Sequence, residues 1–124
     1  MSMNRYIIYI EPTGRFGRVH CWPGATLPLK DLQELVDGPI EIVPTVITKG
    51  TVREDDVRAV MIVNEEGKLR KLPKNSEACL IATLWPGDYI AGNALLMGAR
   101  GEELVGFTEE AADRIISRWL EVGK

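Results

Sequence analysis

The 124-residue sequence has one histidine, two cysteines and no long apolar run, and each shortage excludes a class of protein. With one His and two separated Cys, a tetrahedral zinc site lacks its usual ligands, so we predict no metal. Cys21 and Cys79 form no Cys-x-x-Cys pair and stand among apolar residues. A disulfide is possible by counting, but buried free thiols fit the sequence better.

The charge balance is also small. Fifteen Lys and Arg stand against 18 Asp and Glu, which gives a net charge of −3. That value excludes a protein that coats polyanions, and it equally excludes a DNA mimic. An apolar fraction of 45% with 27% charged residues is ordinary for a globular protein, and the length fits one domain over residues 1–124.

Targeting and membrane signals are missing as well. The longest uncharged apolar stretch, Ala78–Pro86, is about half of the ~20 residues that a bilayer span needs. The N-terminal MSMNRYIIYIEP has an apolar run too short for a secretory signal. We expect a soluble cytoplasmic protein without a membrane segment.

Familiar catalytic motifs are absent too. The sequence contains no Gly-x-Ser-x-Gly elbow, no P-loop and no Gly-x-Gly-x-x-Gly, so we predict no nucleotide cofactor and favour a protein that is not an enzyme. The single His20 is expected to be structural, although a role as base for Cys21 stays open.

What is present predicts an α+β fold, with a mostly antiparallel sheet of about five strands. Apolar alternation and β-branched residues favour strands, and Pro44 favours an edge or a bend in its strand. Tyr6–Ile10 is expected near the centre of the sheet, and Lys49–Asp56 is expected to be a turn. The candidate strands are Tyr6–Ile10, Val19–Trp22, Pro39–Val46, Arg58–Asn64, Lys68–Leu72 as a hairpin arm, and Tyr89–Met97, with Gly92 as a bulge or close backbone approach.

Two main helices are predicted to pack on this sheet, over residues 27–37 and 108–122. Thr26 and Thr108 are candidate N-caps, while Gly38 and Gly123 are candidate stops, with Gly38 in the left-handed conformation. Residues 76–84 are either a short third helix, which we favour, or a buried strand. The last helix presents one apolar face, made of Ala112, Ile115, Ile116, Trp119 and Leu120.

One short segment is strongly basic. Four positive charges fall within seven residues, at Lys68, Arg70, Lys71 and Lys74. Such a patch could hold a phosphate group. The alternative is a charged edge strand that discourages aggregation. The segment has no aromatic residue for base stacking, so nucleic acid is an unlikely partner.

Polar residues also stand where apolar strands meet turns. Asn64 and Asn75 suit turn chemistry, but the two amides could instead line a small polar pocket with Glu65 and Gln33. The acidic pairs are expected to be solvated or to cap helices, since they fall at turns or at a helix start, at Glu65-Glu66, Glu102-Glu103 and Glu109-Glu110.

Three stretches resemble a known family. They are LQELVDGPIE at 32–41, VNEEGKLRKLPKN at 63–75 and DYIAGN at 88–93. Their order and spacing are similar to the uncharacterised "domain of unknown function 3846", which is met mainly in bacteriophages and mobile elements. The resemblance implies a small α+β accessory protein and draws attention to Gln33, Gly38, Glu41, Asn64, Glu65, Gly67, Pro73, Asn75 and Gly92.

Three functions follow as hypotheses. The first is a non-enzymatic binding module that acts on a host protein or a small phosphorylated ligand, with Asn64, Glu65, Asn75, Gln33, Glu41, Lys68, Arg70, Lys71 and Lys74 as candidate ligand-binding residues. The second is a structural homo-oligomer joined through a sheet edge or the Trp119 face. The third is a small enzyme that uses Glu65 or Glu41 as a general base.

Overall fold

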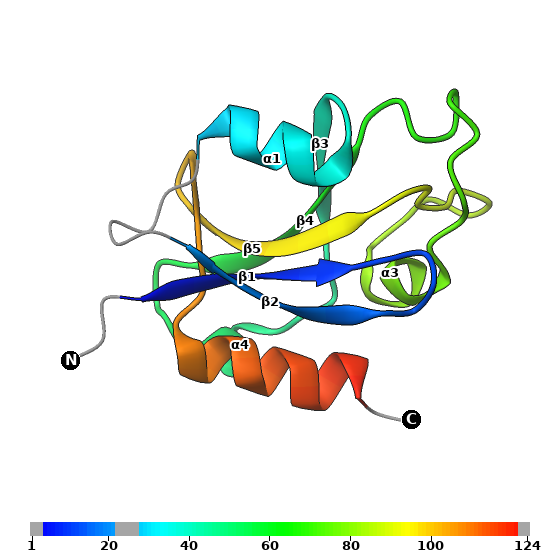
Figure 1. Ribbon diagram of the computed structural model, residues 1–124. Helices are drawn as coiled ribbons and strands as arrows, with labels where there is room; N and C mark the ends of the chain where they lie inside the picture. Colours follow the sequence, from blue (N-terminus) through cyan, green and yellow to red (C-terminus); the bar gives the residue numbers. More distant parts are fainter. Residues whose placement is uncertain (1–3, 22–27, 122–124) are drawn as a thin grey trace.

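A computed structural model describes residues 4–21 and 28–121 of the chain (Figure 1). It confirms the α+β class: a six-stranded sheet has strand order β2-β1-β5-β4-β3, and β6 pairs with β5. All five strand pairs are antiparallel. The strands are β1 (Arg5–Ile10), β2 (Phe16–Cys21), β3 (Ile40–Pro44), β4 (Arg58–Asn64), β5 (Ala94–Arg100) and β6 (Glu103–Val105).

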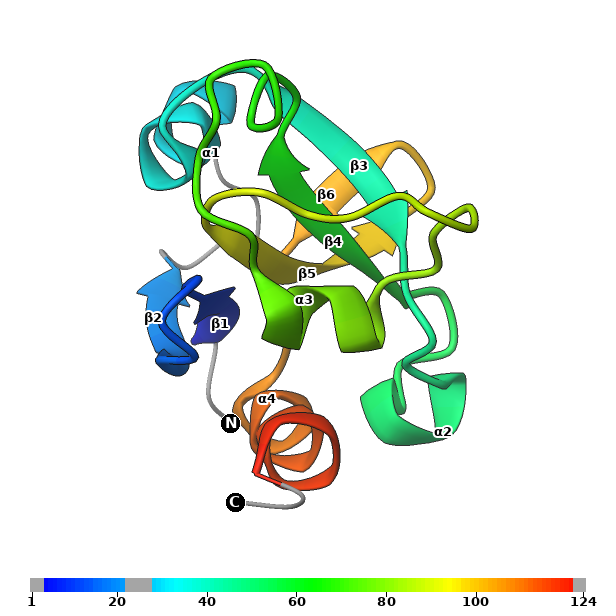
Figure 2. The same cartoon turned by 90° about the vertical axis from the view of Figure 1, so that its right-hand side faces the viewer.

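The helices lie on both faces of the sheet, which gives three layers (Figures 1 and 2). One face is covered by α1, whose Leu32 and Val36 pack against the apolar side chains of the central strands. The other face is covered by α3 and α4, with α2 at its margin. The helices are α1 (Leu29–Val36), α2 (Lys49–Val52), α3 (Ser76–Ile81) and α4 (Glu109–Ile115), which a turn of π-helix, η1 (Ile116–Leu120), continues. None of the helices in the described residues is long and apolar enough to cross a membrane.

The central strand β4 shows why this layering follows from the sequence. Val60 and Ile62 face the α1 side, while Met61 and Val63 face the α3 and α4 side. Because both of its faces are buried, the strand reads as an almost continuous apolar run rather than an alternating one. In the antiparallel pairing of β4 with β5, Met61 lies opposite Leu96.

Several predictions are confirmed. β1 lies between β2 and β5, away from the sheet edges, and Pro44 lies on the edge strand β3. Residues 76–81 form a helix, and the Thr108 hydroxyl accepts a hydrogen bond from the Ala111 N–H at 3.1 Å to cap α4. Both cysteines are free thiols. Cys21 is fully buried, as predicted, and burial raises its pKa to about 11, whereas Cys79 is only partly buried.

The predicted hairpin arm at Lys68–Leu72 is wrong. Residues 65–71 form consecutive turns, and Lys71 has a left-handed backbone with φ of 55°. Gly67 explains the tight path, because a Cβ at this position would lie 2.4 Å from the Ala91 carbonyl oxygen. The basic side chains of residues 68–71 therefore project from consecutive turns and not from a strand.

Other boundaries also differ from the prediction. The strand expected from Tyr89 begins only at Ala94, because Gly92 turns the chain with φ of 91°. The left-handed residue that ends α1 is Asp37, not Gly38. The expected turn at residues 49–56 contains the single-turn helix α2, and β6 was not predicted. Thr26, Trp22 and Gly123, which were assigned to a cap, a strand end and a helix stop, lie outside the described residues.

A buried amide holds together three segments that are distant in sequence. Asn75 is fully buried, and its Nδ2 donates hydrogen bonds to the Ile10 carbonyl at 2.8 Å and the Gly92 carbonyl at 2.9 Å. Its Oδ1 accepts a hydrogen bond from the Ala78 N–H at 3.1 Å, which caps α3. One side chain thus joins the end of β1, the approach to β5 and the start of α3.

Replacing this amide should destabilise the whole fold. We expect Asn75→Ala to lower the free energy of unfolding by about 2–4 kcal/mol, because two carbonyls and one N–H lose their partner in a buried site. The matched control is Asn93→Ala, since Asn93 is exposed and makes one long contact of 3.5 Å to the Leu35 carbonyl. That control should change stability by less than about 0.5 kcal/mol in urea unfolding. Equal effects of the two changes would contradict the assigned role.

Candidate functional site

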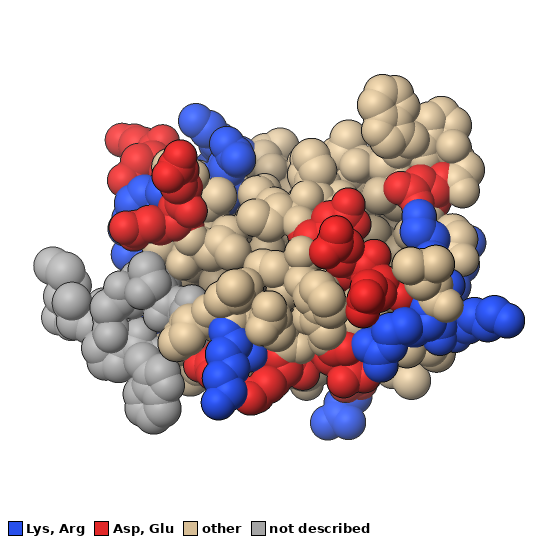
Figure 3. Space-filling view, turned by 90° about the horizontal axis from the view of Figure 1, so that it is seen from above, with Lys and Arg blue, Asp and Glu red and all other residues tan. Residues whose placement is uncertain are grey.

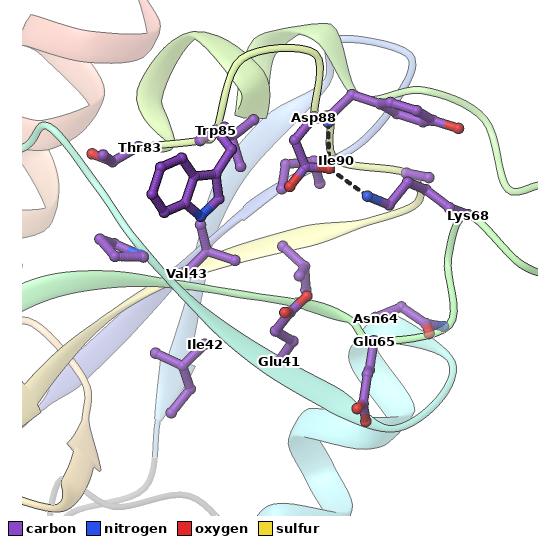
Figure 4. Close-up of a pocket in the computed structure, with 15 residues that line it drawn as sticks. Glu41, Ile42, Val43, Asn64, Glu65, Lys68, Thr83, Trp85, Asp88 and Ile90 are labelled. Atoms are coloured by element: carbon purple, nitrogen blue, oxygen red, sulfur yellow. Dashed lines mark hydrogen bonds and ion pairs between the residues drawn. The ribbon is translucent and has the colours of Figure 1, made fainter.

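A groove lies between the edge strand β3 and the segment that connects α3 to β5 (Figure 4). Its volume is about 190 Å³. Side chains from β3, from the end of β4, from the following turn and from the connecting segment surround it. These residues are Glu41, Ile42, Val43, Pro44, Val63, Asn64, Glu65, Lys68, Thr83, Leu84, Trp85, Asp88, Tyr89, Ile90 and Ala91.

One wall of the groove is a strand edge. β3 pairs with β4 on its inner side, where Val43 lies opposite Met61. On its outer side only the last part is paired: the Thr83 N–H donates to the Pro44 carbonyl at 2.8 Å. Pro44 fits this edge because the missing N–H of proline removes no bond to β4. The rest of the outer edge flanks the groove.

The opposite wall is apolar and exposed. Trp85 has 84% of its surface exposed, and Tyr89 has 38%. On the strand side, the Ile42 side chain is 52% exposed and points away from Trp85, to the face of the sheet that its partner Ile62 shares with α1 (Figure 4). In the close-up, the Trp85 indole lies beside Val43, the Glu41 and Asp88 carboxylates lie toward the other end of the groove, and the Glu65 side chain points away from the hollow (Figure 4). Trp85 and Tyr89 thus place exposed aromatic surface beside the hollow, and such surface is of the kind that marks an interaction site.

An ion pair between Lys68 and Asp88 lies at this wall of the groove. The Lys68 ammonium donates to Asp88 Oδ1, and the Tyr89 N–H donates to the same oxygen at 2.8 Å. The hydrogen bond to Asp88 raises the pKa of Lys68, and the charge of Glu41 adds to this effect. The hydrogen bond from Lys68 lowers the pKa of Asp88, with the Tyr89 N–H as the second cause.

The groove is acidic on balance. Glu41, Glu65 and Asp88 contribute three carboxylates to its lining and Lys68 one ammonium group, so the local net charge is −2. Since Lys68 is engaged with Asp88, Glu41 and Glu65 have no ion-pair partner among the described residues. Elsewhere on the face seen from above, basic side chains at the right-hand end are interspersed with acidic ones (Figure 3).

Comparison with protein families gives a clear result at this point. The family model described as "Domain of unknown function (DUF3846)" matches residues 3–120. The chain belongs to this family. No curated protein and no solved structure matches the chain.

Asn64 and Gly38, within the stretches that resemble DUF3846, have structural roles. Asn64 is 5% exposed; its Nδ2 donates to the Val36 and Asp37 carbonyls, both at 3.0 Å, and its Oδ1 accepts from the Glu66 N–H at 2.7 Å. A Cβ on Gly38 would lie 2.7 Å from that Nδ2, so the close approach requires glycine. Asn64 thus fastens the end of α1 to the end of β4.

Four of the nine predicted ligand-binding residues of this DUF3846 chain meet at the groove: Glu41, Asn64, Glu65 and Lys68. The other five lie elsewhere. Gln33 is on α1, and Arg70 binds the Asp37 carbonyl and carboxylate at the end of that helix. Lys71 is exposed, Lys74 lies 6.0 Å from the centre of the Tyr89 ring, and Asn75 is buried as described.

Two important parts of the groove were missed by the sequence analysis. Trp85 and Ile42 both line the groove, and neither was among the predicted ligand-binding residues. In the described part of the chain, no group of three or more His, Cys, Asp or Glu side chains could hold a metal ion.

The ion pair can be tested by titration. We expect the Asp88 carboxyl to titrate below the ordinary aspartate pKa of ~3.9, followed by its side-chain carbon signal in NMR. Because the folded-state pKa is lowered, the stabilisation by the pair is present at neutral pH and is lost as pH falls through that pKa. Lys68→Met should raise the Asp88 midpoint, whereas Lys71→Met, which removes an exposed charge outside the groove, should leave it in place. An unchanged midpoint in Lys68→Met would refute the pairing.

Proposed function

We propose that the protein is a non-enzymatic binding module whose groove holds a segment of a partner protein. The observation that carries the proposal is the exposed Trp85 side chain facing an open strand edge across a hollow. The resemblance to phage and mobile-element proteins makes a host protein the expected partner, met in the host cytoplasm.

The size of the groove supports a protein segment over a small molecule. Pockets for small molecules usually measure about 300–1,000 Å³. The groove, at about 190 Å³, fits one long side chain of a partner better than a whole ligand. A hollow of about 390 Å³ lies near Pro73 and Gly92, but none of the nine predicted residues lines it and its charged residues are Glu11 and Asp37.

The other hypotheses stay predictions. A small phosphorylated ligand would need several free basic groups, but Lys68 and Arg70 are paired with carboxylates and Lys74 lies over Tyr89. Lys71 is exposed but does not line the groove. An enzyme based on Glu65 or Glu41 would act from exposed carboxylates. A homo-oligomer through a sheet edge remains an outcome of the experiments below.

The proposal is tested by placing a photo-crosslinking amino acid, p-benzoylphenylalanine, at Ile42 in cells that naturally carry the gene. The matched control is the same replacement at Leu29, since the two side chains are 52% and 55% exposed and Leu29 lies on α1, outside the groove. We expect a covalent adduct with a second polypeptide from position 42 only. The additional change Trp85→Ala should reduce it, and Leu80→Ala, another exposed apolar side chain at 77%, should not.

Two results would contradict the proposal. One is no adduct from position 42, and the other is equal adducts from positions 42 and 29. A rise in melting temperature with inorganic phosphate that Lys68→Met abolishes would instead support the phosphorylated-ligand hypothesis.

A further inference from the structure

We infer that the groove recognises its partner by strand addition: an extended segment pairs with the outer edge of β3 and inserts an Arg or Lys side chain beside Glu41, at the acidic end of the groove. The inference rests on the proposed function and adds to it the mode of binding and the chemistry of the partner.

The backbone of β3 offers free hydrogen-bonding groups. In an antiparallel ladder, alternate residues direct their N–H and C=O groups to opposite sides of the strand. Val43 pairs with Met61 toward β4, and the Pro44 carbonyl bonds outward to Thr83, so Ile42 also directs its backbone groups outward. No described residue makes a hydrogen bond to them. One donor and one acceptor at Ile42 are therefore open to an incoming strand, and Ile40 continues the same edge.

The chain itself shows that this edge accepts a strand. The Val46 N–H donates to the Ile81 carbonyl at 2.9 Å, and Thr45 forms an antiparallel bridge with Ala82. This short added segment ends at Thr83, where the chain leaves the edge toward Trp85. A partner strand would take up the pairing where the chain's own segment stops.

The side chains around the groove define what this strand should carry. Glu41 and Val43 alternate with Ile42, so they share the face of the sheet that α3 covers, where Val43 joins the same apolar cluster as Ile81. Every second side chain of an added strand points to that face. Such a side chain would pass along the exposed Trp85 indole and end near the carboxylates.

A long cationic side chain can contact both the Trp85 indole and the carboxylates. The aliphatic stem of Arg or Lys packs on aromatic surface, and its charge is attracted both to the indole face and to carboxylates. Glu41 and Glu65 have no ion-pair partner among the described residues, whereas the Lys68 charge is already matched by Asp88. The local net charge of −2 selects a basic partner.

A second copy of this chain is a poorer occupant. Pairing two β3 edges would bring two sets of Glu41 and Glu65 together, and like charges in an interface are unfavourable. Pro44 would also face the partner edge with no N–H to donate. The test below includes this outcome.

The inference is tested by selecting a displayed library of random nine-residue peptides on the full chain. We expect enriched peptides to share one Arg or Lys flanked by alternating β-branched residues. Their affinity for four variants is then measured by fluorescence anisotropy. Ile42→Pro, which removes the outward N–H, should weaken binding by about tenfold, while Ile42→Val should change it by less than about twofold.

The contribution of the groove's carboxylates to peptide binding is tested with a separate variant and a matched control. Glu41→Gln combined with Glu65→Gln should weaken binding by about 3- to 10-fold and reduce its salt dependence. Glu66→Gln, next to Glu65 but outside the groove lining, should stay within about twofold. If Ile42→Pro does not fold, the wild-type Ile42 amide signal supplies the test, since it should gain hydrogen-exchange protection when peptide is added.

The outcomes separate this inference from the proposed function. If position 42 crosslinks to a partner but the enriched peptides lack a basic residue or bind Ile42→Pro normally, strand addition is wrong and the binding function stands. If there is neither crosslinking nor enrichment, both fail. A dimer by light scattering that Ile42→Pro dissociates would replace the basic peptide with a second copy of the chain.

Discussion

The buried Asn75 amide is the interaction on which the arrangement of the groove depends. It bonds to the end of β1, to Gly92 before β5 and to the first turn of α3. Its own backbone N–H donates to the Ile90 carbonyl at 2.8 Å. The groove wall runs from the end of α3 to Gly92, and Asn75 ties its Gly92 end to β1. The Thr83 N–H, which donates to the Pro44 carbonyl, ties its other end to β3. These hydrogen bonds set where the segment that carries Trp85 and Asp88 lies relative to β3.

The two edge strands of the sheet, β2 and β3, differ in how their outer edges are protected. On β2, Arg18 forms ion pairs with Glu109 and Asp113 of α4, which places charge along that edge. On β3, the chain closes part of the edge with residues 81–83 and leaves the part around Ile42 open. Charge and coverage are the usual protections of an exposed edge. An open stretch that carries an apolar side chain and faces a hollow is therefore a feature that a function explains.

Most of the fold could be predicted from the sequence because its signals were local. The apolar runs of β1 and β4, the Thr108 cap and the edge position of Pro44 follow from propensity and hydrogen-bonding rules. The turn after β4 could not be predicted, because its path depends on the contact of Gly67 with Ala91, 24 positions away. The late start of β5 has a similar cause, since Asn75 holds the Gly92 carbonyl.

The site was predictable in part for the same reason. Asn64 and Glu65 were predicted where a strand meets a turn, Lys68 was predicted as part of the basic segment, and Glu41 was predicted from the family resemblance. The fold brings all four to the lining of the groove. Their individual roles could not be read from the sequence: Asn64 became a structural junction, and Lys68 acquired a carboxylate partner 20 positions away. The basic cluster looked like an anion site because its partners, Asp37 and Asp88, lie outside the local sequence.

Amide hydrogen exchange in the free protein tests most directly whether the outer edge of β3 is open. The Ile42 amide should exchange at nearly the rate of an unstructured peptide, while the Glu41 and Val43 amides, which bond to β4, should be strongly protected. Protection of Ile42 equal to that of its two neighbours, in the monomeric protein without any partner, would show that this edge is already occupied and would contradict the account.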